Sequence, residues 1–406
     1  MPASSLRAYA DRIEADLRGN LLPFWIEHVV NREKGSFHGE LSNDLRVSPD
    51  VERGALLSTR ILWTYAEAFT VYPEEEYKKM ADYAFADLVR LYADRVHGGF
   101  IWSVDAAGQP LKTRKQVYGQ AFAIYALATY HRATGHPEAL ELAKATFRLL
   151  ELEARDPRHG GYREAFARDW SPIEDMRLSP IDLNAPKSQN THLHLMEAFT
   201  ALLRVWPDAE VKAAQAELLE VMLTRILDDS GRHLGLFFTD DWQRWNDTVS
   251  YGHDIEAAWL LHEAATVLGE PAIHERIRQV TVNIAAETLR LAIDDDGALL
   301  YEGNPRDGVT KDHKEWWPQA EALVGFLDAY EISSEERFLR TARGLWDFIG
   351  AKLVDREHGE WFRGTDRTGN PLPGESKVSF WKCPYHNGRM GLEAVRRLRQ
   401  LADVQA

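Results

Sequence analysis

One arrangement of apolar and polar positions recurs along the chain. Six stretches are rich in alanine and apolar on most sides of a helical projection. They lie at residues 53–69, 118–134, 190–206, 251–268, 316–333 and 385–401. A helix that is apolar nearly all round must be buried. The pattern therefore predicts six inner helices.

Each unit also carries a second helical pattern with far more charge, as at residues 73–94. Ahead of the inner helices lie glycine turns with aromatic, alternating stretches, as in "HGGFIWSVDAAGQPL" at residues 97–111. The turn glycines recur at positions 39, 98, 160, 235, 297 and 359. Alternation closed by Asp, Gly or Asn turns predicts a short β-hairpin in each unit, followed by an inner and an outer helix.

Six such units predict an all-α fold, an (α/α)6 barrel, in which six helix-pair repeats form a toroid with short β-hairpins at one end. Residues 1–406 then form a single catalytic domain, and the repeat accounts for the length. An open helical solenoid is the alternative. The chain shows no obvious polar capping repeat, which an open solenoid would need, so closure is favoured.

The composition of the chain excludes some classes of binding partner and cellular location. The formal net charge is −15 and no basic tract is present, so we expect no nucleic-acid binding. No run of 18 apolar residues and no signal-peptide pattern occur, so we expect no membrane span. Cys383 is the single cysteine, which excludes a disulfide framework and fits a reducing compartment. We expect a cytoplasmic protein and a monomer, with a homodimer as the alternative.

Polar side chains gather where the inner helices begin, and in a ring of units these ends meet at one mouth. They are Arg60; Tyr118 and Gln120; Asn190, His192 and His194; His253, Asp254 and Glu256; Trp316, Trp317 and Gln319; Trp381, Tyr385, His386, Asn387 and Arg389. Some of these polar side chains must accept hydrogen bonds from the unpaired N–H groups at a helix start. Asn190 and Ser250 are the expected caps.

Three histidines exceed what capping needs: His194, His253 and His386. His194 lies three residues before Glu197, and His253 three before Glu256, so each pair shares a helix face. A carboxylate behind an imidazole fixes its tautomer and raises its basicity. Hydrogen-bonded core histidines are the alternative for any one of them. No compact metal motif is present, so we expect no metal and no cofactor.

Two acid/base groups of neutral range suit removal and return of a proton at a carbon next to a carbonyl. Helix starts, and a full charge from Arg60, would stabilise the enediolate. A structural ion pair is the alternative role for Arg60. An (α/α)6 glycoside hydrolase would need two carboxylates, but histidines dominate the mouth. A non-catalytic protein would not need the histidine set.

Six segments carry a family resemblance: "RGALLSTRILWTY", "RKQVYGQAFAIYAL", "NTHLHLMEAFTALLRVWP", "SYGHDIEAAWLL", "WWPQAEALVGF" and "FWKCPYHNGR". Over essentially the whole chain they resemble the cellobiose 2-epimerases of the N-acylglucosamine 2-epimerase superfamily, which have an (α/α)6 barrel. One departure is Ser58, where many relatives are expected to have Asn.

The resemblance implies epimerisation at C2 of the reducing-end glucose of β-1,4-linked disaccharides, without a cofactor. Cellobiose would become glucosyl-mannose and lactose would become epilactose, through a cis-enediolate. His253 and His386 match the two acid/base histidines, and His194 matches a third essential histidine. The matched sugar-binding residues are Arg60, Tyr118, Asn190, Glu256, Trp316 or Trp317, and Trp381.

The same superfamily contains monosaccharide 2-epimerases and mannose–fructose isomerases that share the three histidines. The resemblance therefore leaves two alternatives open: a disaccharide epimerase, or an enzyme of free mannose and glucose. It also does not decide which tryptophan of the pair Trp316 and Trp317 stacks on the sugar.

Overall fold

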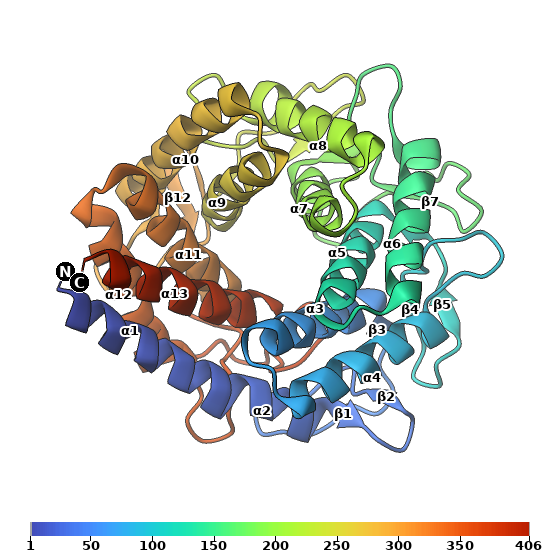
Figure 1. Ribbon diagram of the computed structural model, residues 1–406, viewed down its shortest axis with the longest axis horizontal. Helices are drawn as coiled ribbons and strands as arrows, with labels where there is room; N and C mark the ends of the chain where they lie inside the picture. The colour runs from blue at the N-terminus through green and yellow to red at the C-terminus, as the bar shows by residue number, and fades with distance from the viewer. Residues whose placement is uncertain (1, 406) are drawn as a thin grey trace. The chain divides into compact units, whose positions relative to one another are not determined.

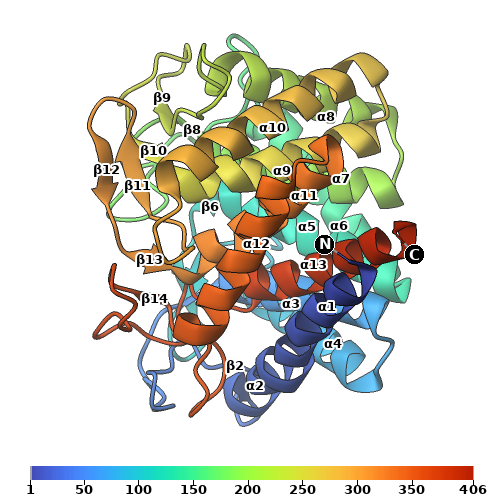
Figure 2. The ribbon, with the colours of Figure 1, turned by 90° about the vertical axis from the view of Figure 1, so that its left-hand side faces the viewer.

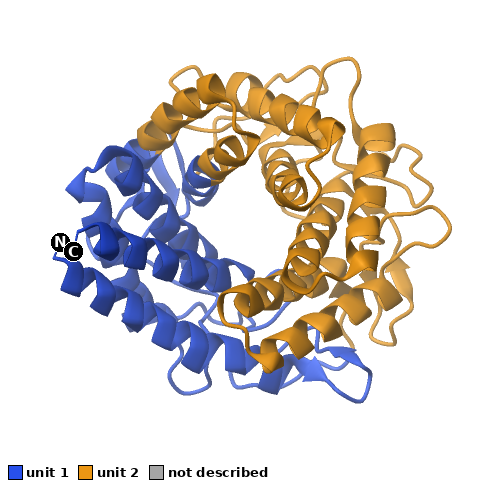
Figure 3. Ribbon diagram, in the orientation of Figure 1, with its two compact units in different colours: residues 1–49, 251–259, 285–406 blue, residues 50–250, 260–284 orange. Residues whose placement is uncertain are grey.

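The computed structural model describes residues 2–405 and is mostly helical. Its internal contacts divide the chain into two compact units, coloured separately in Figure 3. Unit 1 comprises Met1–Pro49, Tyr251–Trp259 and Ala285–Ala406, and unit 2 comprises Asp50–Ser250 and Leu260–Ile284. No helix among the described residues is long and apolar enough to cross a membrane.

Unit 2 contains three successive pairs of an inner and an outer helix (Figure 1). The helices are α3 (Ala55–Val71), α4 (Glu75–Leu91), α5 (Val117–Thr134), α6 (Pro137–Leu149), α7 (Gln189–Val205) and α8 (Ala209–Val221). α3 packs on α4, α5 on α6 and α7 on α8, while α5 also packs against both α3 and α7. Its strands are β3 (Arg53–Gly54), β4 (Ser103–Val104), β5 (Pro110–Lys112), β6 (Lys115–Gln116), β7 (Ala165–Phe166), β8 (Lys187–Ser188), β9 (Phe237–Phe238) and β10 (Val249–Ser250).

Unit 1 joins the two ends of the chain, because α1 (Ala3–Asp16) packs along α13 (Tyr385–Val404), and the two lie side by side in Figure 2. α11 (Trp316–Ser333) packs on α12 (Glu336–Phe348) and on α13. The remaining elements are α2 (Leu22–Phe24), β1 (Val30–Asn31), β2 (Ser36–Phe37), β11 (Glu302–Asn304), β12 (Gly308–Lys311), β13 (Lys314–Glu315) and β14 (Gly364–Thr365). α9 (Tyr251–Leu268) begins in unit 1, and α10 (Pro271–Ala292) ends there.

The predicted division into inner and outer helices is confirmed. Every residue of α5 from Val117 to Tyr130 is buried, and so is every residue of α11 from Trp316 to Tyr330. In α12, by contrast, the buried residues form one stripe with helical spacing: Phe338, Leu339, Ala342, Leu345, Trp346 and Phe348. A sequence that is apolar all round thus forms a helix that is covered on every side. An amphipathic sequence forms a helix with one face exposed to solvent.

The β-structure differs in part from the predicted hairpins. Local hairpins do form between β1 and β2, β4 and β5, and β11 and β12. Several strands of two residues pair across neighbouring repeats instead: β6, just before α5, pairs with β7, which follows α6. β8 pairs with β9, and β13 with β14, in the same way. The backbone just before an inner helix is therefore bonded to the next repeat.

Buried lysines anchor these cross-repeat strands. In β6, Lys115 Nζ lies 2.8 Å from Asp94 Oδ2 and 2.7 Å from the carbonyl oxygen of Gly98. In β8, Lys187 Nζ lies 2.8 Å from both Asp156 Oδ2 and the carbonyl oxygen of Gly160. Unit 1 repeats the arrangement, with Lys314 on Asp296 and Lys377 on Asp355. All four lysine side chains are fully buried.

Buried amide and imidazole side chains hold three inner helices, α5, α7 and α11, to the turns before them. The Gln120 Oε1 accepts a bond of 2.8 Å from the Phe100 N–H, and its Nε2 donates to the Phe100 carbonyl at 2.7 Å. Gln319 makes the same two bonds to Leu299. His192 Nε2 accepts from the Tyr162 N–H at 2.9 Å. Burial lowers the pKa of His192 to about 4, so this ring is neutral.

We predict that Lys187→Met lowers the free energy of unfolding by about 3–5 kcal/mol, because it leaves the Asp156 carboxylate buried without its cation. Urea unfolding measures the loss. Lys78→Met is the matched control, since Lys78 pairs with Asp82 on a half-exposed helix face and its loss costs about 0.3–0.5 kcal/mol. Equal midpoints for the two variants would contradict the anchoring role.

The difference in the free energy of unfolding between the wild type and Lys187→Met should depend on pH. Burial raises the pKa of Asp156, but the Lys187 ammonium and two backbone N–H groups outweigh it and hold that pKa below its usual value. A depressed carboxyl pKa contributes stability above the unfolded pKa, and this contribution is lost as the pH falls. The difference between wild type and Lys187→Met is therefore expected to shrink below about pH 4.

Candidate active site

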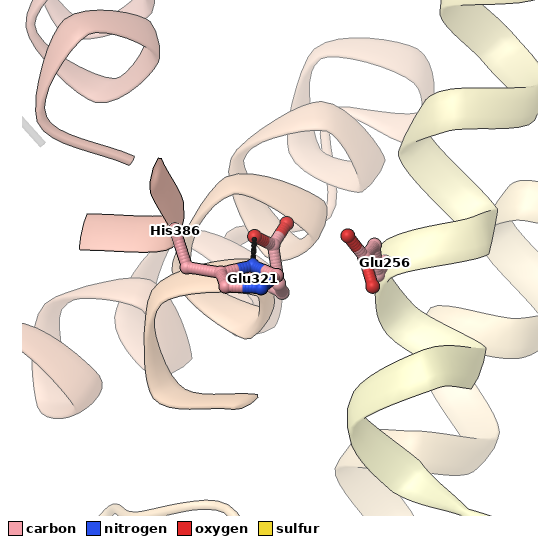
Figure 4. A group of neighbouring side chains, drawn as sticks. All are labelled: Glu256, Glu321 and His386. Carbon is pink, nitrogen blue, oxygen red and sulfur yellow. Dashed lines mark hydrogen bonds and ion pairs between the residues drawn. The ribbon is translucent and has the colours of Figure 1, made fainter. Parts of the chain in front are cut away.

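His386 lies at the first turn of α13 and faces a carboxylate on α11 (Figure 4). Its Nδ1 is 2.7 Å from Glu321 Oε1, and both side chains are buried. The Trp259 Nε1 donates to the other oxygen of Glu321 at 3.1 Å. A carboxylate at Nδ1 accepts the proton of that nitrogen, so Nε2 becomes the ring atom that can exchange a proton with a ligand.

Arg389, one turn further along α13, bridges two carboxylates. Its Nη2 lies 2.6 Å from Glu256 Oε1 on α9 and 2.7 Å from Glu321 Oε1. The guanidinium carbon is 4.7 Å from the ring centroid of Trp259 and 4.4 Å from that of Tyr385, whose hydroxyl it also contacts. The side chain is 1% exposed. A planar cation between two aromatic rings and two carboxylates is held in one orientation.

Glu256, Glu321 and His386 also form a donor set that could hold a metal, with ligand atoms within 4.8 Å of one another. The charge that a metal would supply is already present, because the Arg389 guanidinium bonds to both carboxylates. A divalent ion would have to displace this buried cation. The donor set therefore fits an ion pair better than a metal centre.

The two neighbouring tryptophans of α11 have different surroundings. The Trp317 ring centroid lies 4.7 Å from that of His253 and 5.7 Å from that of His386. Trp316 lies between two cations, with Lys382 Nζ at 5.3 Å and Arg363 Cζ at 5.5 Å from its centroid. Trp317 is thus the tryptophan beside both histidines. Trp381 is half-buried and packs on Phe380.

His253 is half-buried near the start of α9. The glycine before it permits close packing, because a Cβ on Gly252 would lie 2.6 Å from the Trp317 ring. Glu256, three residues further along α9, is ion-paired with Arg389 of α13. The predicted support of His253 by Glu256 stays a prediction.

In unit 2, His194 forms the pair expected from its spacing: its Nδ1 is 2.9 Å from Glu197 Oε2, and both side chains are buried. The His194 ring packs against Tyr118 and Phe122, with centroids 5.0 and 4.7 Å away. The Arg60 Nη2 donates to the Tyr118 hydroxyl at 2.7 Å. Arg60, Tyr118 and His194 therefore form one cluster.

The structure corrects the predicted cap of α7 and shows the partner of Ser58 in α3. Ser188, not Asn190, caps α7, since its Oγ accepts from the Thr191 N–H at 3.1 Å. Asn190 is the second residue of that helix and is half-buried. Ser58 donates to Asp87 Oδ2 at 2.7 Å and so binds the outer helix α4.

Several predicted mouth residues serve the scaffold, while Glu321 was missed. Gln120, His192 and Gln319 bond to backbone, and Asn387 donates to the buried Glu360 at 2.8 Å. The repeat itself carried a signal for Glu321. It lies two residues after Gln319, just as His194 follows His192 and Arg389 follows Asn387. A carboxylate between two alanines, near the start of an inner helix, was the second signal.

The sequence of residues 35–386 matches the family model of N-acylglucosamine 2-epimerase. The chain is 42% identical over 381 residues to the cellobiose 2-epimerase of Bacteroides fragilis, covering 94% of this chain and 97% of that protein. A more distant similarity, 26% over 313 residues and 73% of each protein, is to the D-mannose isomerase of Thermobifida fusca.

Among solved structures, the cellobiose 2-epimerase of Spirochaeta thermophila DSM 6192 superposes with a TM-score of 0.92 and 40% identity, over 98% of each chain. The predicted all-α, (α/α)6 fold class is confirmed by this agreement, because cellobiose 2-epimerases have that fold. The match to the family model and the identities over nearly the whole chain show that this protein belongs to the N-acylglucosamine 2-epimerase family and is a carbohydrate epimerase.

Proposed function

We propose that this protein epimerises the reducing-end glucose of β-1,4-linked disaccharides at C2, converting cellobiose to glucosyl-mannose and lactose to epilactose. The observation that carries the proposal is that two histidines, His253 and His386, both lie close to Trp317, with ring centroids 4.7 and 5.7 Å from its own. His386 has its Nδ1 on a carboxylate, which prepares Nε2 for proton transfer.

The reaction needs no group beyond these side chains and the sugar. In the open-chain aldehyde, the carbonyl at C1 acidifies the proton on C2. One histidine takes that proton, and the C2–H electron pair forms the cis-enediolate. The other histidine then gives a proton to the opposite face of C2, and the C1 carbonyl is restored. Each histidine ends in the protonation state in which the other began.

The Arg60 cluster supplies the charge and hydrogen bonds for the enediolate in this proposal. Arg60 carries a full positive charge, the Tyr118 hydroxyl accepts from it, and His194 packs against Tyr118. Developing negative charge on O1 and O2 is best stabilised by donors already fixed in place. Asn190, on the same helix as His194, is proposed to bind a sugar hydroxyl.

Aromatic rings provide the sugar platforms. Of the two neighbouring tryptophans we assign the stacking role to Trp317, because Lys382 and Arg363 flank the Trp316 ring. Trp381 is proposed as the second platform, since a half-buried indole keeps one part of its ring accessible. Glu256 acts indirectly in this assignment, through its ion pair with Arg389.

A monosaccharide-acting enzyme is the second candidate, favoured by the similarity to a D-mannose isomerase. The same enediolate yields a ketose when the proton returns to C1 instead of C2, so the two activities share their machinery. The higher identity to cellobiose 2-epimerases supports the disaccharide. A hydrolase is disfavoured, because it needs a protonated carboxyl group and Arg389 favours the ionised form of Glu256 and Glu321.

Proton NMR in D2O tests the reaction. Cellobiose and lactose, incubated with the enzyme in buffer containing EDTA, are expected to give manno-configured product that carries deuterium at C2. Mannose and glucose serve as comparison substrates. Faster exchange on the free hexoses would favour the second candidate, and release of glucose from cellobiose would favour the hydrolase. No exchange on any of the four sugars would refute both isomerase candidates.

We expect His253→Asn and His386→Asn each to reduce C2 exchange by about 10²- to 10⁴-fold, because each removes one of the two proton carriers. Single-turnover exchange measured by NMR gives the loss. His262→Asn is the control, since His262 lies on α9 with His253 but packs on His274. Full activity in either active-site variant, or an equal loss in His262→Asn, would refute the assignment.

Glu321→Gln is expected to lower kcat by about 10²-fold with little change in KM. It keeps the side chain's size but removes the charge that stabilises the His386 imidazolium. At least one limb of the pH profile of kcat should move to lower pH, because an imidazole without its carboxylate loses its proton more readily. A profile identical to that of the wild type would argue against a role for Glu321 in proton transfer.

A further inference from the structure

We propose that Arg389 is a positioning residue for the reaction: it keeps Glu321 ionised and thereby fixes the tautomer of His386. This inference rests on the proposed function of His386 as a proton carrier. Arg389 acts through Glu321, and no contact between Arg389 and the sugar is required.

The first step of the inference, that Glu321 is ionised, rests on the hydrogen bonds around its carboxylate. Glu321 Oε1 receives two donors, His386 Nδ1 at 2.7 Å and Arg389 Nη2 at 2.7 Å. The other oxygen accepts from the Trp259 Nε1, so the ionised carboxylate, which only accepts hydrogen bonds, fits this set of three donors best. The guanidinium cannot lose its charge in a protein, so its presence favours the ionised form of Glu321 at every working pH.

The second step of the inference concerns the net charge of the buried cluster around His386. Arg389 contributes one positive charge, and Glu256 and Glu321 contribute two negative charges, so the cluster retains one negative charge. One protonated imidazole, that of His386, neutralises it. Lys382 and Glu360, also in unit 1, form a buried ion pair of their own. The cluster can therefore accommodate both protonation states of His386 with a net charge of at most one.

Loss of Arg389 has a definite chemical consequence. Glu256 and Glu321 would then be two buried carboxylates with no cation between them, and like charges favour uptake of a proton by one of them. A protonated Glu321 would donate its hydrogen to His386 Nδ1. The neutral ring would then carry its proton on Nε2, the atom that must accept the proton from C2.

The same helix supplies a matched control. Arg397 lies two turns further along α13 and is also buried, 8% exposed, against carboxylates of α11. Its Nη1 lies 2.9 Å from Asp328 Oδ1 and also contacts Glu331. Arg389 and Arg397 thus both join α13 to carboxylates of α11, but only Arg389 contacts Glu321, the partner of His386.

The direct test reads the tautomer without any sugar. With 15N-labelled histidine, long-range 1H–15N spectra distinguish a proton on Nδ1 from one on Nε2, and His386→Asn assigns the signal. We expect the neutral ring to carry its proton on Nδ1 in the wild type and on Nε2 in Arg389→Met. Arg397→Met should keep the wild-type tautomer. An unchanged His386 tautomer in folded Arg389→Met would overturn the inference.

Kinetics give a second test that separates positioning from stability. Arg389→Met is expected to lower kcat about 10²-fold or more with KM nearly unchanged. In the Glu321→Gln background the same change should cost less than about 3-fold, because the residue through which it acts is already neutral. Full multiplication of the two losses would overturn the proposed route. Arg397→Met is expected to lower the urea midpoint without changing the pH profile.

Arg389→Lys covers the case in which the methionine variant does not fold. Lysine keeps the charge but not the two-pronged bridge, so the wild-type tautomer and more than a tenth of kcat should remain; loss of both would contradict the inference. The two proposals fail separately. A tautomer switch in Arg389→Met, with no C2 exchange by the wild type on any sugar, would support the role of Arg389 and refute the epimerase.

Discussion

Buried charge that must be paired is the constraint on which this structure depends. The start of each inner helix lies in a covered environment, where unpaired N–H, C=O and ionic groups cost several kcal/mol. Lys115 and Lys187 meet this constraint by bonding at once to an aspartate and to a turn carbonyl. Each such lysine joins its strand to the loop of the same repeat. Neighbouring repeats are joined by strand pairing. These scaffold bonds hold the starts of the inner helices without any contribution from the functional side chains.

The candidate active site applies the same rule to reactive groups. His386, Glu321, Arg389 and Glu256 form a continuous chain of buried bonds from α13 to α11 and α9. Each member bonds to the next, and Arg389 offsets one of the two carboxylate charges. This series of bonded side chains differs from the lysine anchors in one member: the imidazole of His386, which can gain or lose a proton at modest cost. The other members are a strong cation and carboxylates that it holds ionised.

The interpretation of the sequence was most accurate where one physical signal dominated. The all-round apolar stretches became α5 and α11, in which every residue of 117–130 and 316–330 is buried, and the His194–Glu197 spacing produced the expected bond. It was least accurate where two elements distant in the chain had to meet. The ion pair between Glu256 and Arg389, which lie 133 residues apart in the chain, was not predicted, because spacing within one helix gives no sign of it. Asn190 looked like a cap, but Ser188, two residues earlier at the end of β8, has the extended backbone that a cap requires.

The sequence by itself determined the repeat, the inner and outer helices, the family and the set of histidines, because these depend on composition and on spacing within one helix. Tertiary structure alone decided which polar residues at the helix starts belong to the scaffold and which to the site. Gln319 and Glu321 are two residues apart on α11, and one binds backbone while the other binds His386. Helix periodicity places both side chains, but their partners lie on other segments, and only packing brings those segments within hydrogen-bonding distance.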